Sequence, residues 1–258
     1  MPKKISWRES LVERLAAPVF AIAIILVWQV AVPLLSLSEF VLPTPWLIAT
    51  RIVTDFSLLA ANSTYTVFEV VAGFGLAVAV GIPLALAIFY WRPFERAMYP
   101  ILVALQTIPK IALAPLLVLY LGYGWGPKIS LAFLISFFPV VISTVVGLQS
   151  LDKGLVDLVR SMGSNEWQTF FKVRLPAALP SVFGGFKVAI SLAVIGAIIG
   201  EYVAAERGLG YLQLQANARF DTALNFATVV VISILGVLLY FILSFVEGRV
   251  VYRRELAK

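Results

Sequence analysis

Few side chains in this sequence could carry out chemistry. The chain contains no His and no Cys, which removes thiol nucleophiles and the usual nitrogen and sulfur ligands of zinc. Three ionisable residues, Glu69, Lys110 and Glu201, fall in or beside long apolar segments. No pair of acids clusters within one segment, so neither a metal site nor a nucleophile–base pair can be assembled. We therefore expect a protein that is not an enzyme and that holds no metal or cofactor of its own.

Isolated charges in apolar segments indicate instead either a path for a solute across the membrane or a buried ion pair. A charge within a membrane helix costs about 2.5–3.5 kcal/mol on insertion scales, so Lys110 should face a wet cavity or a partner such as Glu201. Gln106 lies one helical turn earlier on the same face. Gln106, Lys110 and Glu201 are thus candidates to line a path for an anionic solute. The alternatives are snorkelling or a structural ion pair for Lys110, and a solvated carboxylate at the outer rim for Glu201. Glu69 has no assigned role.

Charge is concentrated in one segment of a chain that is 61% hydrophobic. Seven charged residues lie between positions 152 and 174: Asp152, Lys153, Asp157, Arg160, Glu166, Lys172 and Arg174. A polar insert of this kind between apolar segments is too costly to place in lipid, so it should lie outside the membrane and contact something soluble.

The same segment predicts a helix–Gly–helix elbow. Apolar residues recur at helical spacing over 151–162, and Asp157 and Arg160 can pair on the polar face to hold the elbow. Gly163 suits the left-handed residue that ends a helix. Ser164 is then a good N-cap for a second short helix, with Glu166 in its first turn. Trp167 and Phe170 give that helix an aromatic edge, and Leu175-Pro176 should stop it.

The elements that carry these residues are membrane helices. A mean hydropathy of +0.96 and apolar runs near the roughly 20 residues that cross a bilayer predict about six spans, near residues 17–37, 65–90, 98–121, 128–149, 178–203 and 223–246. The third span is interrupted by Pro100, Pro109 and Pro115, which should kink it. We expect an all-α integral membrane protein, residues 1–258 forming a single transmembrane domain, with the elbow at about 150–177.

Orientation follows from the 20 Lys and Arg residues. With both termini inside, the basic residues near the termini and in the elbow lie inside, including Lys3, Lys4, Arg8, Arg14, Arg253, Arg254 and Lys258. Only Arg51, Lys128, Arg207 and Arg219 then lie outside. The positive-inside rule favours this topology, with both termini cytoplasmic. A net charge of +6 therefore reflects orientation in the bilayer, and because the charges are dispersed we expect no nucleic acid partner.

The ordering of Asp157-Leu158-Val159, Gly163 and Leu175-Pro176 resembles the coupling loop of ABC importer permeases of the binding-protein-dependent type. Leu158 and Val159 depart from the small residues of that signature. Further stretches resemble the nitrate/sulfonate/taurine branch, which includes carriers of pyrimidine precursors and aromatic carboxylates: Phe40-Val41-Leu42-Pro43, Gly81-Ile82-Pro83-Leu84, Ile108-Pro109, Leu113-Ala114-Pro115-Leu116 and Gly208-Leu209-Gly210-Tyr211-Leu212. The similarity covers about residues 40–250. Glu69 is acidic where that branch is commonly basic.

The resemblance implies partners for this chain. It implies a type I importer permease in a bacterial inner membrane, working as a homodimer with ATP-binding cassette ATPase subunits and an external solute-binding protein. ATP and Mg would be bound by the ATPase, since the chain lacks a G-x-x-x-x-G-K-[ST] loop. The residues expected to contact or support the ATPase interface are Asp157, Arg160, Gly163, Ser164, Asn165, Glu166, Trp167 and Phe170.

Two questions remain open at this point. A transporter or channel driven by an ion gradient is the alternative function, although it leaves the elbow unexplained and the chain has few buried carboxylates for a proton relay. The small-residue stripe of Gly196, Gly200 and Ala204 could pack helices within one chain or form the seam of a dimer.

Overall fold

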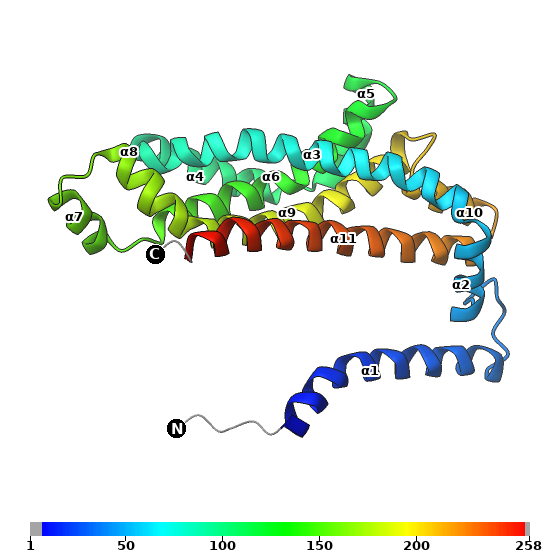
Figure 1. Ribbon diagram of the computed structural model, residues 1–258. Coiled ribbons are helices and arrows are strands. Elements are labelled where there is room, and N and C mark those ends of the chain that lie inside the picture. Colours follow the sequence, from blue (N-terminus) through cyan, green and yellow to red (C-terminus); the bar gives the residue numbers. More distant parts are fainter. Residues whose placement is uncertain (1–6, 256–258) are drawn as a thin grey trace. The chain divides into compact units, whose positions relative to one another are not determined.

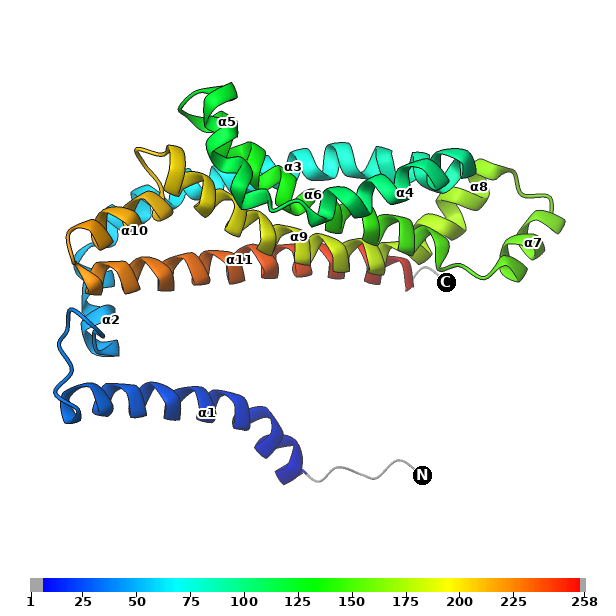
Figure 2. The same ribbon diagram turned by 180° about the vertical axis from the view of Figure 1, so that it is seen from behind.

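The computed structural model describes residues 7–255, with side chains described from residue 18 to residue 251, and this part of the chain is helical with no strand (Figures 1 and 2). The helices are α1 (Trp7–Leu34), α2 (Pro45–Thr54), α3 (Phe56–Tyr90), α4 (Arg92–Thr107), η1 (Lys110–Leu113), α5 (Ala114–Leu121), α6 (Trp125–Gln149), α7 (Lys153–Ser161), α8 (Glu166–Thr169), η2 (Phe170–Arg174), α9 (Leu175–Ala204), α10 (Leu209–Ala218) and α11 (Thr222–Glu255). The all-α class predicted from hydropathy is confirmed.

The predicted spans correspond to these helices with one change. Four helical stretches of the described chain are long and apolar enough to cross a membrane: Phe56–Tyr90, Trp125–Gln149, Glu166–Ala204 and Thr222–Val251. A fifth candidate is the bent pair Arg92–Thr107 plus Lys110–Leu121, and Pro18–Leu34 forms a shorter apolar helix. The chain is therefore a multi-pass membrane protein.

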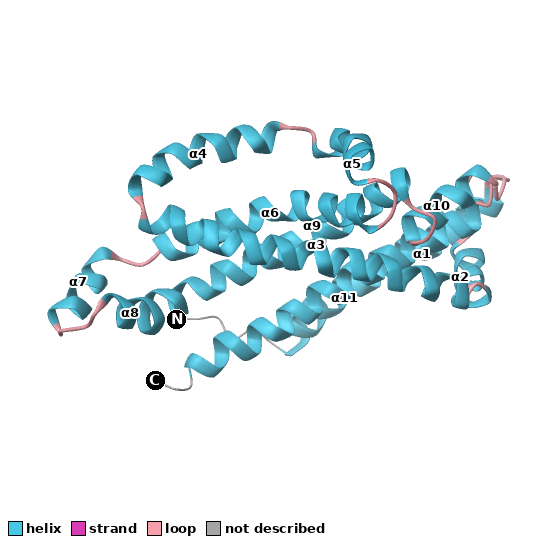
Figure 3. Cartoon of the chain, turned by 90° about the horizontal axis from the view of Figure 1, so that it is seen from above, coloured by secondary structure: helices cyan, strands magenta, loops and turns pink. Residues whose placement is uncertain are grey.

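The predicted third span is broken rather than merely kinked. α4 ends at Thr107, the chain is extended at Ile108, and the two halves meet at 80° (Figure 3). Pro109 has no N–H to continue the helix, and it disfavours a helical conformation in the residue before it. A short 3₁₀ turn, η1, follows it and leads into α5. Gln106 and Lys110 consequently lie on opposite sides of the break.

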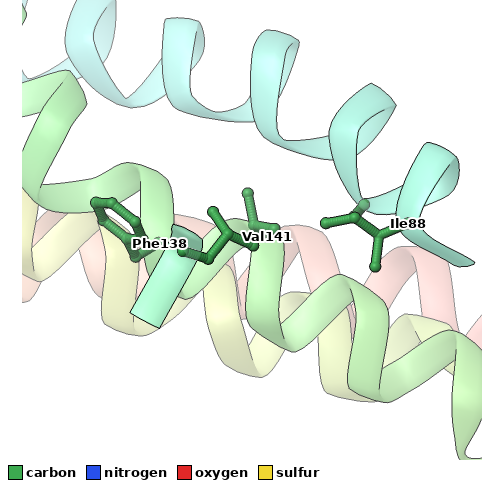
Figure 4. Close-up of a cluster of buried hydrophobic side chains, with 5 residues drawn as sticks. Ile88, Phe138 and Val141 are labelled. Carbon is green, nitrogen blue, oxygen red and sulfur yellow. The ribbon is translucent and has the colours of Figure 1, made fainter. Parts of the chain in front are cut away.

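The chain divides into two compact units, and the larger contains Ala60–Leu212 and Val231–Lys258. Its centre is α6, which packs along α9 and contacts α3 and α4. Figure 4 shows Ile88 of α3 beside Phe138 and Val141 of α6, and Leu102 of α4 joins this buried cluster. At the same level of α6, Val140 is fully buried in a second cluster with Ala77 of α3 and Ala189 of α9.

Small residues bring α9 directly against the backbone of α6. A Cβ added at Gly196 would lie 2.7 Å from the Cα of Ala132, and one added at Gly200 would lie 2.7 Å from the Cα of Lys128. Glycines allow this approach because membrane helices associate by close packing rather than by excluding water. At Gly196 and Gly200 the small-residue stripe therefore packs within the chain.

The smaller unit contains residues up to Leu59 and Gln213–Val230. Arg51 forms ion pairs with Asp55, at 2.7 Å, and with Asp221, at 2.6 Å. Trp28 packs on Phe226 with the ring centroids 6.1 Å apart. Residues distant in the sequence are thus joined by polar and aromatic contacts in this unit.

One residue used to infer the orientation is more buried than expected. Lys128 was counted on the outer side, at the start of the span predicted near 128–149, and it lies in the first turn of α6 with its side chain buried. Lys3, Lys4 and Lys258 lie outside the described residues, as do the side chains of Arg8, Arg14, Arg253 and Arg254.

Candidate functional site

The predicted elbow is present between α6 and α9, at one end of the larger unit (Figure 1). Its first helix, α7, begins at the N-cap Asp152, whose carboxylate accepts a hydrogen bond from the Gly154 N–H at 3.0 Å. Val156 is buried, whereas Leu155 and Leu158 remain exposed. α7 therefore attaches to the bundle by a narrow apolar contact and leaves apolar side chains on its surface.

Gly163 ends this helix in the manner predicted. Its φ angle is +86°, and its N–H donates to the Arg160 carbonyl at 2.9 Å. A side chain with a Cβ rarely adopts this left-handed conformation, because the Cβ approaches the following carbonyl. The turn direction of the elbow thus depends on a glycine at this position.

The second helix is capped one residue later than predicted. Asn165, not Ser164, is the N-cap of α8: its side chain accepts from the Gln168 N–H at 2.8 Å, and the Gln168 side chain accepts from the Asn165 N–H at 3.1 Å. Ser164 instead forms a hydroxyl–hydroxyl contact with the buried Thr169, at 2.9 Å. Gly163 and Ser164 both lie in the segment that joins α7 to α8. The reciprocal hydrogen bonds between Asn165 and Gln168 form a capping box, which Ser164 does not make.

An ion pair bridges the two helices of the elbow. Arg160 of α7 is paired with Glu166 of α8. This replaces the pairing within α7 that was predicted for Asp157 and Arg160. Both partners are about half exposed, so the pair fixes the geometry more than it adds stability.

Aromatic side chains cover the outer edge of α8 and the turn that follows it. Trp167 is 73% exposed, and its ring is stacked parallel on Phe171 with centroids 5.6 Å apart. Phe170 is turned toward the membrane helices, where its ring lies 6.0 Å from that of Tyr90 at the end of α3. The elbow thus presents an exposed aromatic surface and anchors itself with Phe170.

The elbow continues into α9 without a break. Leu175-Pro176 was expected to stop the second helix, but α8, the π turn η2 and α9 form one continuous helical stretch, Glu166–Ala204. Pro176 is the second residue of α9 and directly follows the π turn, so the helix continues through the proline instead of ending there. A displacement of α8 would therefore be carried directly into a membrane helix.

Glu201 lies near the end of α9, where the sequence placed it, but its side chain is buried. It is 1% exposed, so it is neither a rim carboxylate nor a partner of Lys110. Its Oε1 accepts from the Thr66 hydroxyl at 2.6 Å, and its Oε2 accepts from the N–H of Gly210. The Thr66 hydroxyl in turn accepts from the Leu209 N–H at 2.9 Å. Glu201 thus ties α3 and α9 to the first turn of α10.

Glu69 forms an ion pair with Lys128 within the same part of the larger unit. The Lys128 Nζ lies 2.5 Å from Glu69 Oε1, and the exposed fractions of the two side chains are 7% and 0%. Lys128 also lies 5.0 Å from the Trp125 ring centroid. Sequence reasoning missed Lys128 and Thr66. One signal could have found Thr66: it precedes Glu69 by three residues and therefore shares its helix face.

Lys110 has partners of its own. Its Nζ donates to the Gln106 carbonyl at 2.9 Å and lies 4.8 Å from the Phe138 ring centroid. The lysine side chain thus satisfies a backbone carbonyl in the last turn of α4, next to the break at Pro109. Gln106 takes part through its backbone rather than through the side chain that was predicted to act.

Comparison with known proteins gives the context for this geometry. Residues 77–254 match the family described as the binding-protein-dependent transport system inner membrane component. The chain is 35% identical to the formylaminopyrimidine transport permease of Halalkalibacterium halodurans, over 88% of this chain and 90% of that protein. It is 36% identical to the riboflavin transport system permease of Chloroflexus aurantiacus, over 90% and 88%.

A solved structure has the same fold. The MetNI methionine ABC transporter, in an inward-facing conformation, matches with a TM-score of 0.63 and 21% identity, over 78% of this chain and 97% of that chain. The family match covers most of the chain, and the relatives at 35–36% identity are named as transport permeases. Both agree with the resemblance inferred from the elbow between two membrane helices. The chain belongs to the binding-protein-dependent inner-membrane components of ABC transporters, and is a permease subunit of an importer rather than an enzyme.

Proposed function

We propose that this chain forms the solute path of an ABC importer and is driven through its elbow by separate ATPase subunits. The observation that carries the proposal is the rigid, exposed elbow between two membrane helices. Gly163 sets its turn, Asn165 caps its second helix, and that helix continues into α9. A soluble subunit that binds the exposed aromatic surface at Trp167 can therefore move α9, because α8 and α9 form one continuous helical stretch.

The residues proposed for this contact divide into two groups. Trp167, Ser164 and Asn165 lie at the tip of the elbow and meet the ATPase, while Phe170 anchors the elbow to α3 through Tyr90. The Arg160–Glu166 pair and Gly163 hold the angle between the two helices, and Asp157 lies on the same face of α7 as Arg160. ATP and Mg are bound by the ATPase and not by this chain.

The wider assembly follows from the same proposal. The chain is one transmembrane permease domain, pairs with a second copy, and receives solute from an external binding protein. Both termini and the elbow face the cytoplasm of a bacterium, since the positive-inside rule favours that orientation. Glu201 and its partners Thr66 and Gly210 then lie toward the outer side, because about 40 Å of α9 separate Leu175 from Glu201.

The solute is proposed to be a small organic anion or a small heteroaromatic compound. Two of the relatives at 35–36% identity are named for formylaminopyrimidine and riboflavin, which supports the heteroaromatic class. The resemblance to sulfonate, taurine and nitrate carriers supports the anionic class. Lys110, beside the break in the helix, and Gln106 are the proposed contacts on the path.

Co-purification tests the function. The tagged chain, expressed with its genomic neighbours and extracted in mild detergent, should bring down an ATPase in stoichiometric amount. Trp167→Ala should lose the ATPase, whereas Phe171→Ala, which removes only the stacked neighbour, should retain more of it. Purification of the chain alone, together with uncoupler-sensitive and ATP-independent uptake in vesicles, would instead establish a transporter driven by an ion gradient.

A further inference from the structure

A cavity of about 540 Å³ lies between the elbow and the ends of the membrane helices. Its walls come from α3, α4, the end of α6, α7 and η2, all in the larger unit. The volume falls within the range of about 300–1,000 Å³ that is usual for small-molecule sites. It is separate from the exposed Trp167 edge proposed to meet the ATPase.

Positive charge dominates this cavity. Four basic side chains line it: Arg92, Lys153, Arg160 and Arg174. Its two acidic lining residues are Glu95 and Asp157. Glu95 Oε1 accepts a hydrogen bond from Gln149 Nε2 at 3.1 Å, and Arg160 is paired with Glu166, which lies outside the cavity lining. The formal charge of the lining is therefore +2, from four cations and two acids.

The cations converge from different elements. Arg92 begins α4, Lys153 begins α7, and Arg174 ends η2, where its guanidinium lies 5.1 Å from the Phe89 ring centroid. These three cations come from separate elements, and the two carboxylates of the lining leave it with an excess of positive charge. A phosphate accepts hydrogen bonds from several cations at once, and Arg side chains match its geometry.

We propose that this cavity binds a phosphate-bearing anion, supplied by the headgroup of an anionic phospholipid in the cytoplasmic leaflet. The side on which it lies rests on the proposed orientation of the chain. The lining residues Phe89, Arg92 and Gln149 lie at the ends of helices that belong to candidate membrane spans, and basic cavities between membrane helices on the cytoplasmic side bind anionic lipids. The bound phosphate joins α7 to α4 and η2, so the lipid holds the elbow against the bundle.

The experiment is a lipid titration followed by native mass spectrometry of the purified full-length protein, together with whatever subunits co-purify. Phosphatidylglycerol should be retained by the wild-type chain, and phosphatidylcholine with the same acyl chains should not. Arg92→Gln and Lys153→Gln should each weaken phosphatidylglycerol binding about fivefold, the effect of one basic residue at an anionic surface. Both side chains are exposed, so both variants should fold.

Matched controls distinguish the cavity from general surface charge. Arg96 lies on α4 and Lys172 on η2, both exposed and neither lining the cavity. Arg96→Gln and Lys172→Gln should bind phosphatidylglycerol as the wild type does. Equal losses in the cavity variants and the controls would overturn the proposal, because the lipid would then be held by diffuse charge.

Two further outcomes would also overturn it. Displacement of the lipid by millimolar inorganic phosphate, with no preference for the lipid, would assign the cavity to free phosphate. Unchanged lipid binding, with loss of the ATPase in Arg92→Gln and Lys153→Gln, would assign it to an acidic segment of that subunit. The lipid titration needs no ATPase, so it gives a result even for a chain that purifies alone.

Discussion

Lys128 and Glu69 form an ion pair from which solvent is almost excluded: Nζ lies 2.5 Å from Oε1, and the side chains are 7% and 0% exposed. The pair joins α6 to α3 beside the hydrogen bonds of Glu201. Removing one partner of a buried pair leaves an uncompensated charge and costs about 3–5 kcal/mol, whereas replacing both with apolar residues is often nearly neutral.

Lys128→Met should therefore lower the thermal unfolding temperature of the purified protein sharply. The double variant Lys128→Met/Glu69→Leu should recover most of the loss, because no buried charge remains. Thermal unfolding in one detergent, compared across wild type, single and double variants, measures both effects. A double variant as unstable as the single one would mean that the pair itself, rather than the orphaned charge, supplies the stability.

Gly210 should tolerate no side chain. A Cβ there would lie 2.9 Å from Glu201 Oε2 and 2.9 Å from the Ile198 carbonyl oxygen. Gly210→Ala should destabilise the protein by about 1–3 kcal/mol, as overpacking does. In a Glu201→Ala background the same change should cost less, since the contact with Oε2 has been removed, while the contacts with the Ile198 carbonyl oxygen and with the Cβ of residue 201, at 3.0 Å, remain.

The control for Gly210→Ala is Gly75→Ala, where nothing lies within 4 Å of the added Cβ. Thermal unfolding and uptake should both remain close to wild type. Equal losses of stability in Gly75→Ala and Gly210→Ala would show that the contact with Glu201 does not restrict the side chain at position 210.

Gly196→Val should disrupt the packing of α9 on α6. The added Cβ would lie 2.7 Å from the Ala132 Cα and 2.8 Å from the Leu131 carbonyl oxygen, both backbone atoms that cannot rotate away. Gly184→Val, on the same helix and with open space around it, carries the same change in helix propensity. We expect markedly lower expression and unfolding temperature only for Gly196→Val. Disruption of subunit association by Gly196→Val, with the single chain still stably folded, would place a dimer seam there instead.

Gly163→Val should abolish ATP-driven uptake while leaving membrane insertion intact. A β-branched residue at φ +86° carries strain of about 1–3 kcal/mol, which the exposed elbow can relieve by changing its turn. Uptake by proteoliposomes with the ATPase and binding protein present, normalised to inserted protein, measures the effect. Gly154→Val is the matched control within the elbow, because Gly154 has an ordinary helical backbone and meets only Asp152, at 3.7 Å or more. Normal uptake by Gly163→Val would contradict the coupling role of the elbow.

Lys110→Met tests the solute path. The lysine closes the broken span through the Gln106 carbonyl, so Lys110→Arg should retain stability and part of the uptake. If Lys110 draws an anionic solute, Lys110→Met should lower the uptake rate about tenfold, which corresponds to about 1.4 kcal/mol, with normal insertion. An unchanged uptake rate and solute preference, accompanied by a lower unfolding temperature, would show that Lys110 only caps the helix end.

The sequence by itself determined the class of the protein, its membrane helices and the elbow. Hydropathy over about 20 residues is a local property, and so are the left-handed preference of Gly163 and the disruption of a helix by Pro109, although a kink was predicted there and the structure shows a break. These features follow from a few consecutive residues, so no knowledge of the tertiary structure was needed. The N-cap was misplaced by one residue because Ser164 and Asn165 are both good caps, and only the pairing of Asn165 with Gln168 decides between them.

Only the tertiary structure decided the partners of the buried charges. Glu69 and Lys128 are 59 positions apart, and Thr66 and Glu201 are 135 apart; no local pattern specifies which of several ionisable residues will meet. From the sequence, Lys110 and Glu201 were both candidates for the solute path and for an ion pair with each other. In the structure, Lys110 bonds across the break at Pro109 to the Gln106 carbonyl, and Glu201 bonds to Thr66 and Gly210. The basic cavity at the elbow arises in the same way, because packing α4, α7 and η2 together brings Arg92, Lys153 and Arg174 into one space.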